Sequence, residues 1–215
     1  MGQGVHPGMR DRPDRPTVFE GCRPRSGMDH EDVERVFPEL GSIDDEELRA
    51  AVGTAWVTAC TDAGIETPEE LHAVPWFPPA ERKLGIPEGE ETLVDHVRDV
   101  TACAVGLAET LVERRDAAVD LDRVVAGALV HDVSKLAEFD GHDETPVGDL
   151  LGHPYWGVHV VASAGLPIEY AHIVLSHTDR TNVEPAFLEA ELVSRADGAA
   201  ASAILATNLE DLRDV

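Results

Sequence analysis

The sequence is short of lysine, cysteine and aromatic residues, and each shortage argues against a class of structure or partner. Lys83 and Lys135 are its only lysines, and 42 acidic residues against 17 basic ones give a formal net charge of −25. Because binding to nucleic-acid phosphates or to anionic lipid requires clustered Lys and Arg, we expect neither partner. The three cysteines form no CxxC pair, which argues against a disulfide framework. Aromatic residues make up 5% of the chain, which favours close-packed helices over a large sandwich.

Long apolar runs are also missing. No stretch reaches membrane-spanning length and no signal peptide is visible, so we expect a cytoplasmic protein without membrane contact. The acid-rich, lysine-poor composition is similar to that of proteins from salt-accumulating halophiles, whose carboxylates hold water and cations while salt screens their repulsion. An acidic mesophilic protein with a solvated surface is the alternative.

The composition changes at Met28. Residues 1–27 are rich in Gly, Pro and Arg, and their five Arg outnumber three acidic residues. This pattern predicts a disordered or non-native N-terminal extension, with a basic peptide-binding tail as the alternative. Residues 28–89 predict a helical segment that packs on the core, 90–207 the main domain, and 208–215 a C-terminal tail.

The periodicity predicts an all-α fold, a bundle of about six to eight helices. Apolar residues recur at spacings of three and four, including Leu107 on the longest stripe. Asp44 and Gly64 are the expected ends of an early helix, and 66–91 is expected to be a short helix followed by an irregular connection in which Trp76 and Phe77 contact the core. The remaining helices are predicted over 91–115, 121–136, 154–164, 167–178 and 185–207, with a loop over 139–152.

Several polar residues lie on these apolar stripes. His96 falls between Leu93 and Val100, Asp132 continues the stripe of its helix, and Asp197 follows Val193 by one turn. A core-facing carboxylate is costly unless it is paired, and few Lys or Arg are available here. A divalent cation is a suitable partner, because it binds both carboxylate oxygen and imidazole nitrogen. Core histidines are more often simply hydrogen-bonded, and we keep a structural interpretation for His30, His72 and His142.

The order His…His-Asp…Asp resembles the signature of the HD superfamily, helical metal-dependent phosphohydrolases, in an HDIG-like form. It is carried by 94-VDHVRDV-100, 127-GALVHDVSK-135 and 194-SRADG-198, in which HDVSK is similar to the HDxxK form of the motif. His153 in 152-GHPYWGV-158 and His177 in 173-IVLSHTD-179 resemble the additional ligands of members that bind two metals. The resemblance covers residues 90–205, about half of the chain.

The resemblance implies a site for divalent metal, two ions among Mn, Fe, Co, Ni or Mg. The implied metal ligands are His96, His131, Asp132, His153, His177 and Asp197. Asp132 would bridge the ions, and a hydroxide generated there would attack phosphorus. Asp132 and Lys135 are the implied catalytic residues. Lys135, Arg98 and Arg180 are candidate phosphate contacts, as is Arg195, although each arginine can equally pair with a neighbouring carboxylate.

The implied substrate is a small, nucleotide-like phosphate ester or anhydride: a phosphomonoester, a phosphodiester or a dinucleoside polyphosphate. The HDVSK, HT and AD stretches are similar to those of diadenosine tetraphosphate hydrolases. The absence of a GYP element and of a Glu-Asp pair after Asp132 argues against cyclic-di-GMP and alarmone substrates. A di-iron oxygenase of the same fold and a non-catalytic binding module are the alternatives. We interpret His159 and His172 as structural, and either a monomer or a homodimer fits the sequence.

Overall fold

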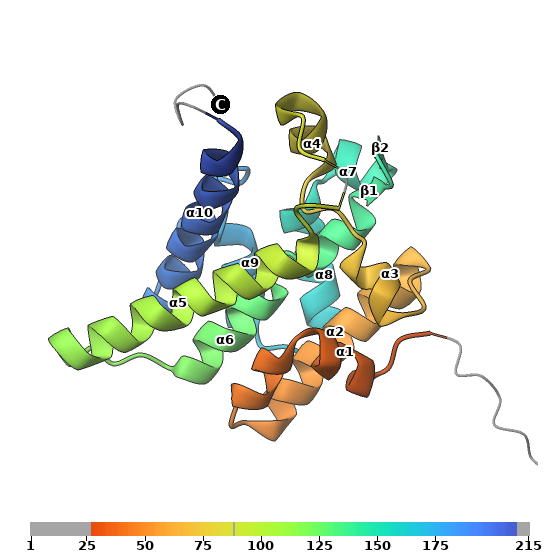
Figure 1. The fold of residues 1–215 in the computed structure, drawn as a ribbon. Coiled ribbons are helices and arrows are strands. Elements are labelled where there is room, and N and C mark those ends of the chain that lie inside the picture. Colours follow the sequence, from red (N-terminus) through yellow and green to blue (C-terminus); the bar gives the residue numbers. More distant parts are fainter. Residues whose placement is uncertain (1–26, 88, 210–215) are drawn as a thin grey trace, which may run out of the picture.

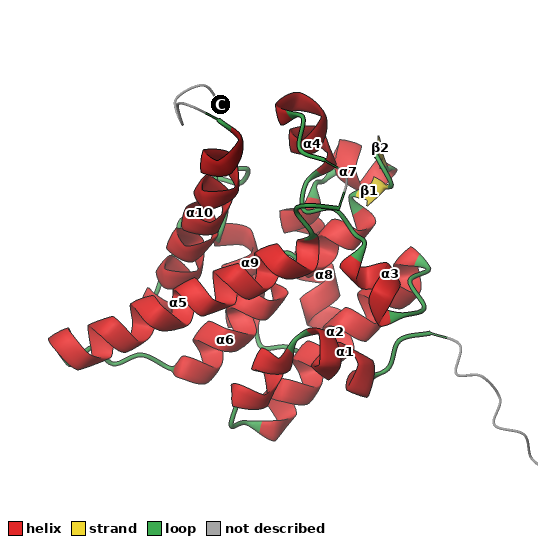
Figure 2. Cartoon of the chain, in the orientation of Figure 1, coloured by secondary structure: helices red, strands yellow, loops and turns green. Residues whose placement is uncertain are grey.

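A computed structural model describes residues 27–87 and 89–209, and it shows a molecule built almost entirely of helices (Figures 1 and 2). Over these residues the chain forms ten α-helices, two 3-10 helices and one two-stranded hairpin, which confirms the all-α prediction. The count exceeds the six to eight predicted because several helices have only five to seven residues. The extension predicted over 1–27 and the tail over 208–215 lie largely outside the described residues.

The N-terminal part of the described chain contributes helices α1 (His30–Val36) and α2 (Glu46–Ala63), joined by the 3-10 helix η1 (Pro38–Ser42). Asp45 caps α2, not Asp44 as predicted, and Gly64 ends it with a φ of 71°. The fully buried Trp56 of α2 stacks on Phe37 and donates a 2.9 Å hydrogen bond from Nε1 to the carbonyl oxygen of Leu129. This bond ties α2 to the chain two residues before His131.

Two short helices follow, α3 (Pro68–His72) and α4 (Pro78–Leu84), each with proline in its first turn. The irregular connection predicted after the first of them is interrupted by α4, because Pro78 and Pro79 need no hydrogen-bonded N–H at the start of a helix. Trp76 is buried in a small apolar cluster with Ile86 and Ile204, apart from the main core.

The centre of the fold is the pair α5 (Leu93–Arg115) and α6 (Leu121–Val130). The helix predicted to reach residue 136 ends at Val130, and the chain continues as the tighter 3-10 helix η2 (Val133–Ala137). A 3-10 helix has three residues per turn, so Asp132, Lys135 and Glu138 fall on one side of it. Leu107, predicted to be in the core, is 40% exposed.

Residues 139–152 are not the plain loop that was predicted. They form a hairpin of β1 (Phe139–Asp140) and β2 (Asp143–Glu144), in which Phe139 pairs with Glu144, and then helix α7 (Pro146–Leu150). Gly141 supplies the left-handed conformation, φ 59°, that the two-residue turn requires. Too few residues take part for a periodic pattern to be detected in the sequence.

Three further helices complete the bundle: α8 (His153–Ser163), α9 (Ile168–Ser176) and α10 (Leu188–Asn208). Helix α10 packs along α5, and α8 packs against α9 and η2 (Figure 1). One hydrophobic core runs from Met28 to Ala200, so the N-terminal helices and the later ones share it. None of the helices in the described part of the chain is both long and apolar enough to cross a bilayer.

Candidate metal centre

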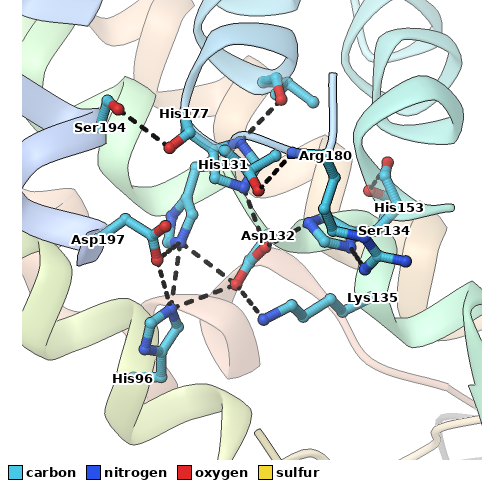
Figure 3. Close-up of polar contacts among 12 residues, drawn as sticks. His96, His131, Asp132, Ser134, Lys135, His153, His177, Arg180, Ser194 and Asp197 are labelled. Atoms are coloured by element: carbon cyan, nitrogen blue, oxygen red, sulfur yellow. Dashed lines mark hydrogen bonds and ion pairs between the residues drawn. The ribbon is translucent and has the colours of Figure 1, made fainter. Parts of the chain in front are cut away.

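Helix ends and one helix interior bring the six predicted ligands together (Figure 3). His96 lies one turn into α5, His131 and Asp132 follow α6, His153 opens α8 and His177 follows α9. Asp197 comes from the middle of α10. The four histidines and Asp132 are all buried.

Asp132 is the central residue, and its two oxygens face different histidines. Oδ2 lies 3.3 Å from Nε2 of His96 and 3.3 Å from Nε2 of His131. Oδ1 lies 3.3 Å from Nε2 of His153 and 3.5 Å from Nε2 of His177. Asp197 joins the first pair, with Oδ1 3.0 Å from His96 Nε2 and 3.7 Å from His131 Nε2. The ligands thus form two donor groups that share one carboxylate.

The far sides of two imidazole rings are fixed by hydrogen bonds. Nδ1 of His131 contacts the carbonyl oxygen of Ala128 at 2.6 Å, and Nδ1 of His177 contacts that of Val174 at 2.7 Å. A carbonyl only accepts, so both rings carry their proton on Nδ1. Nε2 is then left with a free lone pair that points into the site, as a metal ligand requires.

Serine side chains hold two of the ligand-bearing segments in place. Ser134 Oγ donates to the carbonyl oxygen of His153 at 2.7 Å, and Ser194 Oγ donates to that of His177 at 3.1 Å. The first bond ties the start of α8 to η2, and the second ties the end of α9 to α10. The donor groups are therefore positioned by the packing of several helices together.

The buried polar atoms of the centre fit a divalent cation. Oδ1 of Asp132 and Nε2 of His153 are buried and form no hydrogen bond of good geometry, whereas Oδ2 of Asp132 is paired with the Lys135 ammonium. Unsatisfied buried atoms of this kind are costly in a core. A set of imidazole nitrogens and carboxylate oxygens is typical of sites for first-row divalent metals, so the donor chemistry matches the cofactor class implied by the sequence.

The ionisation states of Asp132, Asp197 and His153 also suit metal binding. Burial opposes the charge of Asp132, but the Lys135 ammonium and His131 outweigh it and hold the pKa of this carboxyl well below its usual range. Asp197 is likewise penalised by burial, yet its contact with His96 lowers its pKa to about 2. Burial lowers the pKa of His153 to about 4 despite the neighbouring Glu138, so this ring is neutral at pH 7. For His96, by contrast, burial is outweighed by the two carboxylates, which raise its pKa, so a bound metal ion would have to displace the proton that they favour.

Glu138 is a site residue that sequence reasoning did not identify. It is fully buried, and its Oε2 lies 2.9 Å from Nδ1 of His153 while its Oε1 lies 2.8 Å from the Arg180 guanidinium. Arg180 Nη1 is also 3.1 Å from His153 Nδ1. The only sequence signal for Glu138 was its position three residues after Lys135, which is itself three residues after Asp132. This spacing places the three side chains on one side only if the segment is a 3-10 helix.

Lys135 and Trp76 form the edge of the centre. The Lys135 ammonium lies 2.7 Å from Asp132 Oδ2 and 5.5 Å from the centroid of the Trp76 ring. The Trp76 ring in turn packs against His96, with 5.3 Å between centroids. Trp76 was predicted only as a core contact, and its place beside a candidate ligand follows from a tertiary contact that sequence periodicity does not encode.

The remaining candidates lie elsewhere. The Arg98 guanidinium pairs with Glu39 at 2.8 Å, and that of Arg195 pairs with Glu191 at 2.8 Å, so neither is among the residues gathered at the centre. His159 is exposed and packs on Trp156.

His172 accepts a 2.9 Å hydrogen bond from the backbone N–H of Ala186, as expected of a structural residue.

Comparison with known proteins gives two matches and one negative result. A family model described as the HD domain matches residues 93–202. Among curated proteins, the chain is 30% identical over 178 residues to a dihydroneopterin 2′,3′-cyclic phosphate phosphodiesterase of Methanocaldococcus jannaschii, an alignment that covers 78% of this chain and 68% of that protein. No solved structure matches the chain significantly.

Proposed function

The chain belongs to the HD-domain family, and we propose that it is a divalent-metal-dependent phosphohydrolase whose substrate is a nucleotide-like cyclic phosphodiester. The observation that carries this proposal is the division of Asp132 between two donor groups, one oxygen facing each. The phosphodiesterase activity named for the Methanocaldococcus relative supports the phosphodiester, and a 2′,3′-cyclic phosphate is the form to test first.

We infer that two ions bind. His96, His131, Asp132 and Asp197 would hold one ion, and Asp132, His153 and His177 would hold the other. When bound, such a pair supplies Lewis-acid stabilisation of phosphate charge and lowers the pKa of water. The neutral form of His153 at pH 7 and the Nδ1 protonation of His131 and His177 keep their Nε2 atoms available for this role.

Lys135 is the residue we propose for binding substrate phosphate. Its side chain is 11% exposed, and its ammonium already lies against Asp132, at the centre of the donor groups. A phosphate oxygen at this place would gain a charge-assisted hydrogen bond. Arg180 offers a second positive charge, because its guanidinium contacts His153 and is 42% exposed.

Water is the nucleophile that the neighbouring side chains leave available. The hydroxyls of Ser134, Ser176 and Ser194 each donate to a backbone carbonyl. Cys60 is buried, and burial raises the pKa of its thiol to about 12, so it carries no thiolate at neutral pH. None of these groups is therefore placed to form a covalent intermediate with phosphorus.

The test is metal analysis together with hydrolysis assays on purified protein in high salt. The panel would contain a nucleoside 2′,3′-cyclic phosphate, bis-p-nitrophenyl phosphate, nucleoside mono- and triphosphates and a dinucleoside polyphosphate, with Asp132→Ala as the control. We expect about two bound ions per chain, in line with the two donor groups. We also expect the wild-type protein to hydrolyse the cyclic phosphate and the Asp132→Ala variant not to do so. Bound iron without turnover of any phosphate ester would contradict the proposal in favour of oxygenase chemistry, and absence of bound metal would refute the centre.

A further inference from the structure

A cavity of about 240 Å³ lies next to the candidate metal centre and shares two wall residues with it. Lys135 lines the cavity, and its ammonium lies 2.7 Å from Asp132 Oδ2. Trp76 also lines the cavity, and its ring packs against His96. A molecule whose phosphate lies at the metal centre against Lys135 can therefore extend into this cavity.

The walls of the cavity suit a flat ring. Trp76 and Phe139 contribute aromatic surface, and Phe77 packs edge-on against Phe139 with 5.9 Å between centroids. Aromatic side chains bind planar rings by offset or edge-to-face contact.

The charges of the cavity exclude a second phosphate group. Among the described residues that line the cavity, Lys135 is the only basic one, and Glu70 and Asp140 contribute two carboxylates. Arg82 and Lys83 line a different cavity. Carboxylates accept hydrogen bonds but donate none, so they favour a ring edge that presents N–H groups. The 2-amino-4-oxopyrimidine edge, common to guanine and pterins, offers N–H donors beside a carbonyl acceptor.

We propose that this cavity binds the fused heteroaromatic ring of the substrate, a guanine or pterin type of ring, and that it selects ring-bearing cyclic phosphates over dinucleoside polyphosphates. The proposal rests on the phosphohydrolase function argued above, because that function places the phosphate at the metal centre beside Lys135. Ring binding itself requires only the cavity.

The experiment fills the cavity from a residue outside the metal centre. Ala63 is the last residue of α2, is exposed and lines the cavity, so Ala63→Phe adds a ring there without burying a polar group. Thr61→Phe, an exposed position in the same turn that does not line the cavity, is the matched control. Binding of guanosine is measured by saturation-transfer NMR titration of the metal-loaded full chain. Hydrolysis of guanosine 2′,3′-cyclic phosphate is compared with that of glycerol 1,2-cyclic phosphate, which has no ring.

We expect Ala63→Phe to weaken guanosine binding and to lower kcat/KM for the guanosine ester by at least about tenfold, in line with the loss of roughly 1.4 kcal/mol of ring contact. Turnover of the glycerol ester should change less than about twofold, and Thr61→Phe should resemble the wild type. Absence of guanosine binding, or equal loss for both esters, would overturn the ring site. Guanosine binding that Ala63→Phe abolishes, with neither ester hydrolysed, would support the ring site and refute the phosphohydrolase function.

Discussion

Replacing Glu138 with glutamine isolates the contribution of one buried carboxylate to metal binding. Glu138 contacts Nδ1 of His153 at 2.9 Å and the Arg180 guanidinium at 2.8 Å, and it is completely buried. The amide keeps the size of the side chain but removes the negative charge that orients His153 and makes its Nε2 a better donor. Loss of such a partner typically lowers metal affinity by about 10- to 100-fold, which corresponds to roughly 1.4 to 2.8 kcal/mol.

The loss should be confined to one of the two donor groups. His153 is the candidate ligand that Glu138 contacts, and it belongs with Asp132 and His177, whereas His96 and Asp197 lie in the other group. Calorimetric titration of metal-free Glu138→Gln with Co²⁺ should therefore show a lower affinity for one ion and an unchanged affinity for the other. Glu144→Gln, an exposed glutamate of β2, is the control. Unchanged affinity for both ions, or an equal loss of both accompanied by a lower Tm, would refute this role for Glu138.

Three further outcomes follow from the same geometry. Asp132→Asn, which removes the shared charge, should abolish hydrolysis and reduce the metal content at both groups, as measured by elemental analysis; a variant that keeps both ions would contradict the bridging role. Lys135→Met should keep its metal but lose about 10- to 100-fold in kcat/KM, the value of a hydrogen bond to a charged group, and steady-state kinetics with a normal metal content would check this. Because burial lowers the pKa of His153 to about 4, the stability that its neutral form contributes to metal-free protein is present above its ordinary pKa of 6.5 and is lost as the pH falls toward 4. Urea unfolding between pH 7 and 4 should therefore show a steeper loss for wild type than for His153→Phe, and equal slopes would argue against a buried neutral ring.

The helical fold was predictable because apolar spacing repeats over long stretches. The positions of His96 and Asp197 on such stripes, and of Asp132 at the end of one, likewise indicated that these polar side chains face a common interior. The structure brings all six predicted ligands together. The sequence was therefore sufficient to predict which side chains lie together at the candidate metal centre.

Features that depend on a few residues or on tertiary contacts were not predictable. The change from α6 to a 3-10 helix after His131 has no periodic signature, and this change places Glu138 behind His153. Arg98 lies only two residues after His96, yet the helical turn points it to Glu39, because residues two apart do not share a helix face. Trp76 reaches His96 from a proline-rich connection whose path no local pattern defines.

The order of the ligands along the chain has a consequence for biosynthesis. His96, His131, Asp132, His153 and His177 all precede α10, and Asp197 is the last ligand to leave the ribosome. The three-residue group around His153 and His177 is complete in sequence before α10 exists, whereas the four-residue group requires α10 to pack along α5. On the nascent chain the four-residue group would thus be completed only after α10 has docked, and the Ser194 contact that holds His177 in the three-residue group forms at the same step.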